Sequence, residues 1–263
     1  MLITYPSLRY HPRMESKLNL QEWFGGIDIY VFDQLLKGRF VPGMRVLDAG
    51  CGSGRNLVYF LRSGYQVFGV DESEAAISQV RKLASSLAPH LPAENFRVGS
   101  VEGVASVFAE EGREPRTVNR ESKTKRDESS AYTLPFAFGS LPAANQQSAV
   151  SNQQSFDVVL SSAVLHFARD EQHWHAMLNA MWSLLKPGGI FLARLASTIG
   201  MENRVRLIEG RRYQLPDGSD RFLVDEAMLH RVTAVLGGEF IEPIKTTVVE
   251  NMRAMTTWVV RKK

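Results

Sequence analysis

One short segment combines an acid with regularly spaced glycines, which suits it to holding a charged small molecule. Asp48 is followed at every second position by a glycine; the three are Gly50, Gly52 and Gly54. Glycine allows a positive φ and lets a ligand approach the backbone without a Cβ in the way. The free N–H groups of a helix that starts here favour a carboxylate or phosphate. We therefore expect a ligand whose amine lies near Asp48 and whose anionic end lies near the helix.

A second acid stands where it can complete such a site. Asp71 ends the next apolar run after the glycine-rich segment. A carboxylate at that position can accept hydrogen bonds from both hydroxyls of a ribose. Hydrogen bonds to a charged group contribute about 1.5–3 kcal/mol each, so this acid predicts nucleoside binding.

Short apolar runs alternate with amphipathic stretches along most of the chain. The expected strands cover residues 45–48, 66–70, 96–98, 156–160 and 190–195. The expected helices cover residues 56–62, 74–87 and 171–185. Strands that alternate with helices pair in parallel, with both faces of the sheet covered. Two further β-rich runs, 240–250 and 254–261, predict a closing antiparallel hairpin.

Residues 104–155 differ in composition from the rest of the chain. After a few residues able to extend a helix, the stretch is first charged and then rich in Asn, Gln, Ser and Ala. Such a composition buries too little apolar surface to offset the entropy of ordering the chain. We therefore predict a mobile insertion at 104–155, with an ordered lid or a partner-binding site as the alternative. Residues 1–40 are predicted to form a helical cap, and 41–263 a single domain that carries the insertion.

Composition excludes several classes of protein. The single cysteine cannot form an internal disulfide, and no Cys/His cluster has zinc-ligand spacing, so we expect no metal. No apolar run approaches the ~20 residues needed to span a bilayer, and no secretory leader is evident, so a cytoplasmic protein without a membrane partner is expected. A net charge of +3 over 263 residues is too small to indicate nucleic-acid binding.

Taken together, the segments resemble the class I S-adenosylmethionine-dependent methyltransferases. The resemblance lies in VLDAGCGSG with its strand-end Asp71, in FDVVLSSAVLHF and in LLKPGGIFLARLAS. The continuous run VLDAGCGSGRNLVYFLRSGYQVFGVD is also similar to the tellurite-resistance methyltransferase branch. The family resemblance implies an α/β fold: a Rossmann-like, mostly parallel seven-stranded sheet with helices on both faces and a C-terminal antiparallel hairpin.

The resemblance also implies which residues hold the cofactor, S-adenosylmethionine. Asp48 would orient the amino group and Asp71 the ribose, with Glu72 beside the adenine. Ser100 stands where many members carry an Asp, so the adenine contact is left to Ser100, Val101 or Glu102. The full set of expected cofactor residues is Asp48, Ala49, Gly50, Cys51, Gly52, Gly54, Asn56, Asp71, Glu72, Ser100, Val101, Glu102 and Ser161. Cys51 is interpreted as a small packing residue rather than a nucleophile.

The acceptor side is less sharply defined. His166 follows the fourth strand and is expected either to act as a base or bind the acceptor, or to pack under the loop. Arg194 interrupts an apolar strand, and a buried arginine needs a partner, which is either an anionic acceptor or a neighbouring carboxylate. Further substrate candidates come from an aromatic N-terminal segment and from a mixed-charge loop at 202–221, and they are Trp23, Tyr30, Arg212 and Tyr213.

These observations predict a methyltransferase acting on a small molecule, with a preference for anionic acceptors. Two alternatives stay open: an NAD(P)-dependent oxidoreductase, and a cofactor-binding protein without catalytic activity. The oxidoreductase is disfavoured because the glycines are spaced G-x-G-x-G, not G-x-G-x-x-G, and because Asp48 precedes them.

Overall fold

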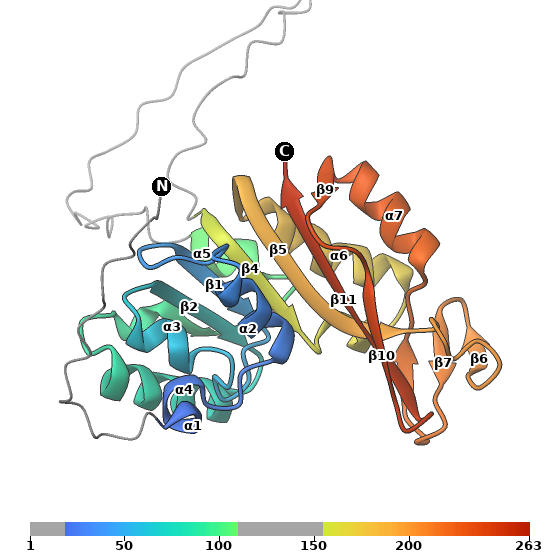
Figure 1. The fold of residues 1–263 in the computed structure, drawn as a ribbon, viewed down its shortest axis with the longest axis horizontal. Coiled ribbons are helices and arrows are strands. Elements are labelled where there is room, and N and C mark those ends of the chain that lie inside the picture. Colours follow the sequence, from blue (N-terminus) through green and yellow to red (C-terminus); the bar gives the residue numbers. More distant parts are fainter. Residues whose placement is uncertain (1–18, 110–154) are drawn as a thin grey trace, which may run out of the picture.

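The computed structural model describes residues 19–109 and 155–263. An eight-stranded sheet runs through the centre of the molecule (Figure 1). Seven of its strands follow the order β10-β11-β5-β4-β1-β2-β3, and β9 pairs with β11 beside this path. The strands of the parallel part are β1 (Arg45–Ala49), β2 (Gln66–Asp71), β3 (Phe96–Val98), β4 (Phe156–Ser162) and β5 (Leu185–Ser197). The remaining strands are β9 (Gly238–Phe240), β10 (Lys245–Val249) and β11 (Arg253–Lys262).

The predicted α/β, mostly parallel fold is confirmed. Strands β3, β2, β1, β4 and β5 are all mutually parallel, while β11 runs antiparallel to β5. The chain therefore reverses strand order between β1 and β4, and the carboxyl ends of the parallel strands meet at one edge. In open α/β sheets, ligands bind at that edge and at that reversal.

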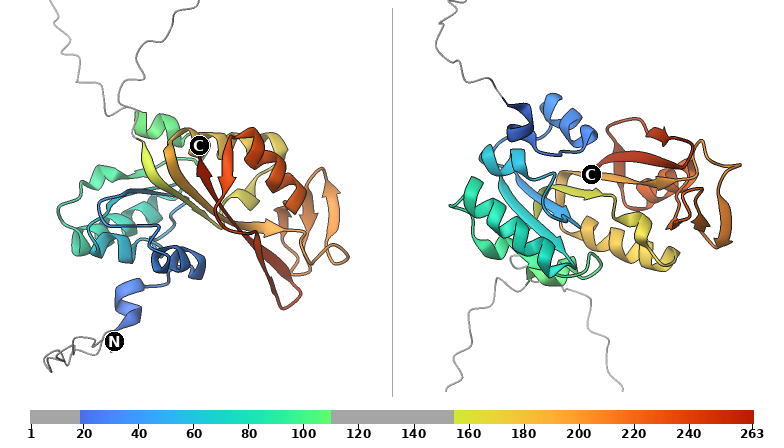
Figure 2. Two further views of the ribbon diagram at one scale, coloured as in Figure 1. Left: turned by 45° about the horizontal axis from the view of Figure 1, so that its top comes forward. Right: turned by 90° about the horizontal axis from the view of Figure 1, so that it is seen from below.

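Helices cover both faces of the sheet because each helix carries one apolar side. One buried cluster joins the sheet to α5 (Val104–Ala109), α6 (Glu171–Ser183) and α7 (Glu226–Val235). The opposite cluster joins it to α2 (Ile29–Leu36), α3 (Val58–Arg62) and α4 (Glu74–Leu87). Figure 2 shows the N-terminal helices and α6 on opposite sides of the strands. None of the helices in the described residues is long and apolar enough to cross a membrane.

Two features differ from the expected architecture. The antiparallel hairpin is present, but β9 adds an eighth strand along the outer part of β11. The mixed-charge loop expected at 202–221 instead forms a separate antiparallel sheet of β6 (Arg206–Glu209), β7 (Arg212–Gln214) and β8 (Asp220–Phe222). Figure 1 shows β6 and β7 beside the turn end of the β10–β11 hairpin. The small sheet therefore stands over the edge where the parallel strands end.

The N-terminal part contains the predicted helices. After Asn19 come α1 (Leu20–Phe24) and α2, each beginning at a side-chain cap, Asn19 for α1 and Asp28 for α2. Residues 104–109 of the predicted insertion form α5, and 110–154 lie outside the described residues. Residues 1–18 of the predicted cap also lie outside them.

Candidate functional site

The glycine-rich turn closes tightly after β1. The amides of Gly50 and Cys51 both donate to the carbonyl of Val70, at 2.8 and 3.0 Å, which ties the turn to the end of β2. Gly50 has a φ of +80°, and a Cβ there would collide with the side chain of Val164. The turn therefore requires glycine at this position both for its backbone angle and for its close approach to the loop after β4.

Asp48 is a buried acid without a hydrogen bond of ordinary geometry. Asp48 is 1% exposed, and neither of its carboxylate oxygens has a hydrogen-bond partner within the described residues. Burial raises the pKa of Asp48 to about 7, and Asp71 adds to the rise, while Arg55 and Asn56 oppose it. A buried, ionised carboxylate without a partner destabilises the folded state unless a cation binds to it. A ligand ammonium group would supply that cation.

Asp71, at the end of β2, forms hydrogen bonds that stabilise the same turn. Its Oδ2 accepts from the amide of Gly52 at 2.8 Å, and its Oδ1 accepts from the amide of Ser73 at 2.9 Å. Each oxygen retains a second lone pair, so the carboxylate can still accept from a ligand diol. Asp71 thus shapes the turn as well as facing the cavity beside it.

A cavity of about 290 Å³, the glycine-turn cavity, lies against this turn. Five of the predicted cofactor residues line it: Gly50, Asp71, Glu72, Val101 and Glu102. Its other lining residues are Ala163, Val164, Phe167, His173 and Met177. Strand ends and the first turns of α6 thus meet around one space, as expected for a ligand at the carboxyl edge of the sheet.

His173 is a residue of this cavity that sequence reasoning missed. Its Nε2 lies 3.3 Å from a carboxylate oxygen of Glu102, and its Nδ1 accepts from the amide of Arg169. Burial alone would raise the pKa of Glu102, but its own backbone amide and His173 hold that pKa below its usual range. Glu102 is therefore an ionised acceptor that lies beside His173. The available signal was spacing, since His173 lies one helical turn before Met177, on the same face of α6.

The other predicted cofactor residues surround the turn without lining the cavity. Cys51 is buried, and burial raises the pKa of its thiol, which fits a packing residue and not a nucleophile. Asn56 is buried and its side-chain oxygen accepts from the amide of Asp28. Ser161 is buried in β4, and its hydroxyl has no partner in the described part of the chain; Ser100 accepts from the amide of Gly103. The remaining four are Asp48 and Gly52, described above, Ala49, which is buried at the end of β1, and Gly54.

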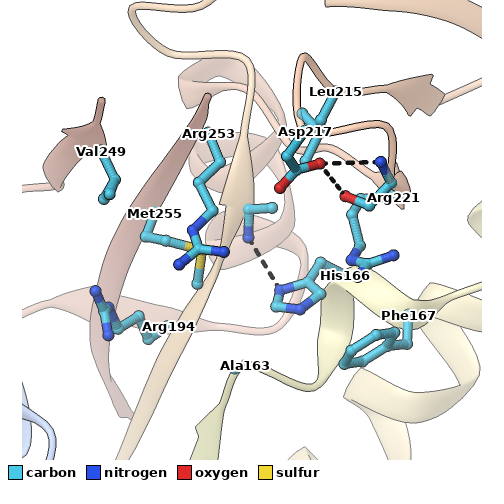
Figure 3. A pocket seen from close by; sticks show the side chains of 12 residues that line it. Ala163, His166, Phe167, Arg194, Leu215, Asp217, Arg221, Val249, Arg253 and Met255 are labelled. Atoms are coloured by element: carbon cyan, nitrogen blue, oxygen red, sulfur yellow. Dashed lines mark hydrogen bonds between the residues drawn. The ribbon is translucent and has the colours of Figure 1, made fainter. Parts of the chain in front are cut away.

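A second cavity of about 310 Å³, the arginine cavity, adjoins the first (Figure 3). The two share Ala163 and Phe167. Three arginines line the arginine cavity: Arg194 on β5, Arg221 on β8 and Arg253 on β11. The other lining residues are Ala163, His166, Phe167, Ala196, Leu215, Asp217, Ser219, Val249 and Met255. Asp217 is the single acid among the described residues of this lining, which therefore carry a positive excess.

His166 lines the arginine cavity as a neutral donor. Its Nδ1 accepts from the backbone amide of Ala196 at 3.3 Å (Figure 3). Burial, followed by Arg221 and Arg253, lowers the pKa of His166 to about 4. A neutral ring whose Nδ1 accepts carries its proton on Nε2. Two roles were expected for His166 at the acceptor site. Donation of a hydrogen bond to the acceptor agrees with this geometry, whereas removal of a proton from the acceptor does not.

Arg194 has a protein partner as well as a place in the cavity. One of its terminal nitrogens donates to Oδ2 of Asp28 at 2.8 Å, while its Nε has no partner among the described residues. The Asp28 side chain is fully buried and also lies 3.7 Å from Arg55. Both roles expected for Arg194, a carboxylate partner and a ligand cavity, are therefore compatible in one place. Asp28 itself was not singled out from the sequence, because its ion-pair partners Arg55 and Arg194 lie 27 and 166 residues away along the chain.

Comparison with known proteins identifies the family. A family model described as a methyltransferase domain matches residues 30–226, which is most of the chain. The chain belongs to this methyltransferase family. The match confirms the class of enzyme predicted from the glycine-rich segment, and it leaves the oxidoreductase alternative unsupported. No curated protein sequence matches the methyltransferase.

Solved structures share the fold at low sequence identity. One is TehB from Haemophilus influenzae, with 17% identity and a TM-score of 0.53 over 90% of this chain; the methyltransferase spans 63% of the TehB chain. A second is 1,6-didemethyltoxoflavin-N1-methyltransferase from Burkholderia thailandensis, solved with its substrate and S-adenosylhomocysteine, with 16% identity and a TM-score of 0.55 over 91% of this chain and 79% of that one. A third is the magnesium protoporphyrin IX methyltransferase of Synechocystis PCC 6803, solved with S-adenosylmethionine, with 15% identity and a TM-score of 0.52 over 90% and 77%.

The junction between the two cavities carries backbone strain. Ala163 of the methyltransferase has a φ of +65°, outside the region that alanine prefers, and its amide donates to the Arg194 carbonyl at 2.7 Å. Strained backbone clusters at ligand sites, where the surrounding structure holds it in place. Ala163 lies directly where a ligand in one cavity would meet a ligand in the other.

Four predicted substrate residues lie outside both cavities. Arg212 and Tyr213 alternate along β7, and Tyr213 pairs with Arg221 while Arg212 pairs with Phe222. Because alternate residues of a strand face opposite sides, Arg221 reaches the arginine cavity and Arg212 lies near Asp220 instead, at 3.8 Å. The ring of Tyr30 lies 5.8 Å from the Arg194 guanidinium and its hydroxyl is 2.8 Å from that of Thr247. Trp23 packs by the guanidinium of Arg62.

Proposed function

We propose that the methyltransferase transfers a methyl group from S-adenosylmethionine to a small anionic acceptor. The donor would occupy the glycine-turn cavity and the acceptor the arginine cavity, with their reacting ends at Ala163. The observation that carries the proposal is that three arginines line a cavity that shares Ala163 and Phe167 with the glycine-turn cavity.

The residues around the glycine turn fit the proposed donor. Asp48 offers an unpartnered buried carboxylate for the amino group, and Asp71 retains lone pairs for the ribose hydroxyls. Glu102, which lies beside His173, offers an ionised acceptor to the amino group of adenine. When bound, S-adenosylmethionine supplies a methyl group already activated on a sulfonium. The protein then needs mainly to hold the two molecules in line, which can contribute about 7–11 kcal/mol to catalysis.

The arginine cavity fits a small acceptor. Its volume of about 310 Å³ is near the lower end of the ~300–1,000 Å³ typical of small-molecule sites. Arginine binds carboxylate and phosphate groups through two parallel hydrogen bonds, which adds orientation to charge. Arg221 also lies over the Phe167 ring, 4.8 Å from its centroid, so its guanidinium is held in place beside the shared wall.

The test is a methyl-transfer assay over matched anionic, neutral and cationic metabolites. We expect turnover on anions, and a rise in acceptor KM of at least tenfold in Arg253→Gln, the equivalent of ~1.4 kcal/mol. Arg261→Gln is the matched control because Arg261 lies exposed on the same strand and lines neither cavity. Preferential turnover of cationic amines, unaffected by Arg253→Gln, would contradict the proposal. Tight binding of NADH without binding of S-adenosylhomocysteine would contradict the donor assignment.

A further inference from the structure

The arginine cavity is rich in hydrogen-bond donors and poor in proton acceptors. The charged or titratable residues that line it are His166, Arg194, Asp217, Arg221 and Arg253. Among the residues that the structure describes, no lysine, tyrosine, cysteine or glutamate belongs to this lining. Removal of a proton from an acceptor would therefore fall to His166 or Asp217.

His166 is unsuited to that task because its lone pair is already used. The amide of Ala196 donates to Nδ1 of His166, so the neutral ring carries its proton on Nε2. A ligand that contacts Nε2 therefore meets a hydrogen-bond donor. Arg221 on β8 and Arg253 on β11 further disfavour a second proton on this ring. His166 is thus a donor in this cavity, like the three arginines.

Asp217 is also a poor proton acceptor. One carboxylate oxygen accepts from both the amide and the hydroxyl of Ser219, at 2.9 and 2.5 Å (Figure 3). These bonds, followed by the charges of Arg253 and Arg221, hold the pKa of Asp217 below its usual range. A carboxylate stabilised in this way stays ionised and takes up a proton weakly near neutral pH.

Resting on the proposed function, we infer that the methylated atom is a carboxylate oxygen of the acceptor. A nucleophile in this cavity must arrive with a free lone pair. Alkyl amines arrive protonated at neutral pH and are repelled by the guanidiniums, and neutral hydroxyls need a base. A carboxylate is ionised without help, and its planar shape matches a guanidinium fork.

The transfer then balances without a proton. A lone pair of the carboxylate oxygen forms the new O–CH₃ bond while the S–CH₃ bond breaks, and the bonding pair remains on sulfur. The products are a methyl ester and neutral S-adenosylhomocysteine, and no proton is taken up or released. His166 Nε2–H and the guanidiniums orient the acceptor, and none of them changes its protonation state.

The first test measures binding, so it does not depend on turnover. Calorimetry with the protein saturated in S-adenosylhomocysteine would compare benzoate and terephthalate with benzamide, which matches benzoate in shape without its charge. We expect the carboxylates to bind at least tenfold more tightly than benzamide, with the preference lost in Arg253→Gln and kept in Arg261→Gln. Equal binding of benzoate, terephthalate and benzamide would overturn the inference.

The second test examines the product. With a methyl-labelled donor and the carboxylate metabolites that turn over, we expect label to be released as volatile methanol in alkali, as methyl esters hydrolyse. We also expect no proton release in a weakly buffered assay, and a rate that is flat between pH 6 and 8 at saturating substrates. An alkali-stable product on an anionic acceptor would overturn the ester assignment and leave the proposed function intact. A rate that falls below an apparent pKa of 6–8, with that dependence lost in His166→Gln, would show a base and also overturn it.

Discussion

The carboxylate of Asp28 and the guanidinium of Arg194 stand 166 residues apart in the sequence and form an ion pair of 2.8 Å. The pair joins the segment before α2 to the middle of the sheet, where Arg194 also lines the arginine cavity. Asp28 further connects to the glycine turn, because its amide donates to Asn56 at 2.9 Å. One buried acid thus contacts both sides of the proposed reaction site.

Asp28→Asn should lower the free energy of unfolding by about 1.5–3 kcal/mol, the range for a hydrogen bond to a charged group. Urea unfolding of Asp28→Asn, Arg194→Gln and the double variant would give a coupling energy of at least about 1 kcal/mol. Asp33→Asn is the control, since Asp33 pairs with Lys37 and Lys245 at the surface and should cost less than about 1 kcal/mol. Additive losses in the double variant would mean that the pair is not a coupled unit.

Asp48→Asn should stabilise the ligand-free protein at pH 8 and weaken cofactor binding. Burial raises the pKa of Asp48 to about 7, against ~3.9 in an unfolded chain, so the folded state binds the extra proton between these values. The contribution of Asp48 to the free energy of unfolding of the wild type therefore falls by up to ~4 kcal/mol as pH rises from about 4 to 7. Thermal unfolding of both proteins at pH 5 and pH 8 should show the variant gaining relative stability at pH 8. S-adenosylhomocysteine affinity should fall at least tenfold; a variant equally destabilised at both pH values would refute the buried-charge argument.

Substitutions at Ala163 should separate backbone strain from side-chain bulk. Ala163→Gly relieves a positive φ that costs an L-residue roughly 1–2 kcal/mol, and it should raise or preserve thermal stability. Ala163→Val adds a branched side chain at the same φ and places it where the two cavities meet, so stability and ligand binding should both fall. If Val were tolerated as well as Gly in thermal unfolding, the strain at this position would be negligible.

Glu242 should stabilise the fold near neutral pH and lose that effect in acid. Burial alone would raise the pKa of Glu242, but Lys245, Lys37 and Arg39 lower it to about 2. Because this is below the unfolded value of ~4.3, the stabilisation is complete above about pH 5 and fades as pH falls towards 2. Glu242→Gln should therefore cost about 1–3 kcal/mol at pH 7 and much less at pH 3, measured by urea unfolding. Glu239→Gln, on the exposed position of β9, should show no such dependence.

The sequence predicted those parts of the fold and site that depend on residues close together along the chain. The glycine turn, Asp48 and Asp71 were predicted because a strand, a turn and a strand end fix them within one short stretch. The parallel strands were predicted because their burial on both faces leaves apolar runs such as 156–160. Arg253 and Asp28 were not predicted, because only tertiary pairing brings them to the site.

The small sheet at 206–222 was missed for a different physical reason. Its strands are three or four residues long, and most of their side chains are exposed or half-buried. Without a buried face there is no alternation of apolar and polar residues, so a solvated loop was the reasonable expectation. Tyr213 pairs with Arg221, and this register determines that Arg221 and not Arg212 reaches the arginine cavity. The sequence alone does not reveal this register.

The division of the site between two parts of the chain has a consequence for how such an enzyme can change. The described residues that line the glycine-turn cavity fall within 50–102 and 163–177, and those that line the arginine cavity fall within 163–255; of these only Ala163 and Phe167 are shared. Under the proposed assignment of donor and acceptor, mutations in β8 and the β10–β11 hairpin would change the acceptor and leave the donor site unaltered. A lineage with this architecture would then keep its methyl donor while its acceptors diversify through changes in these late strands.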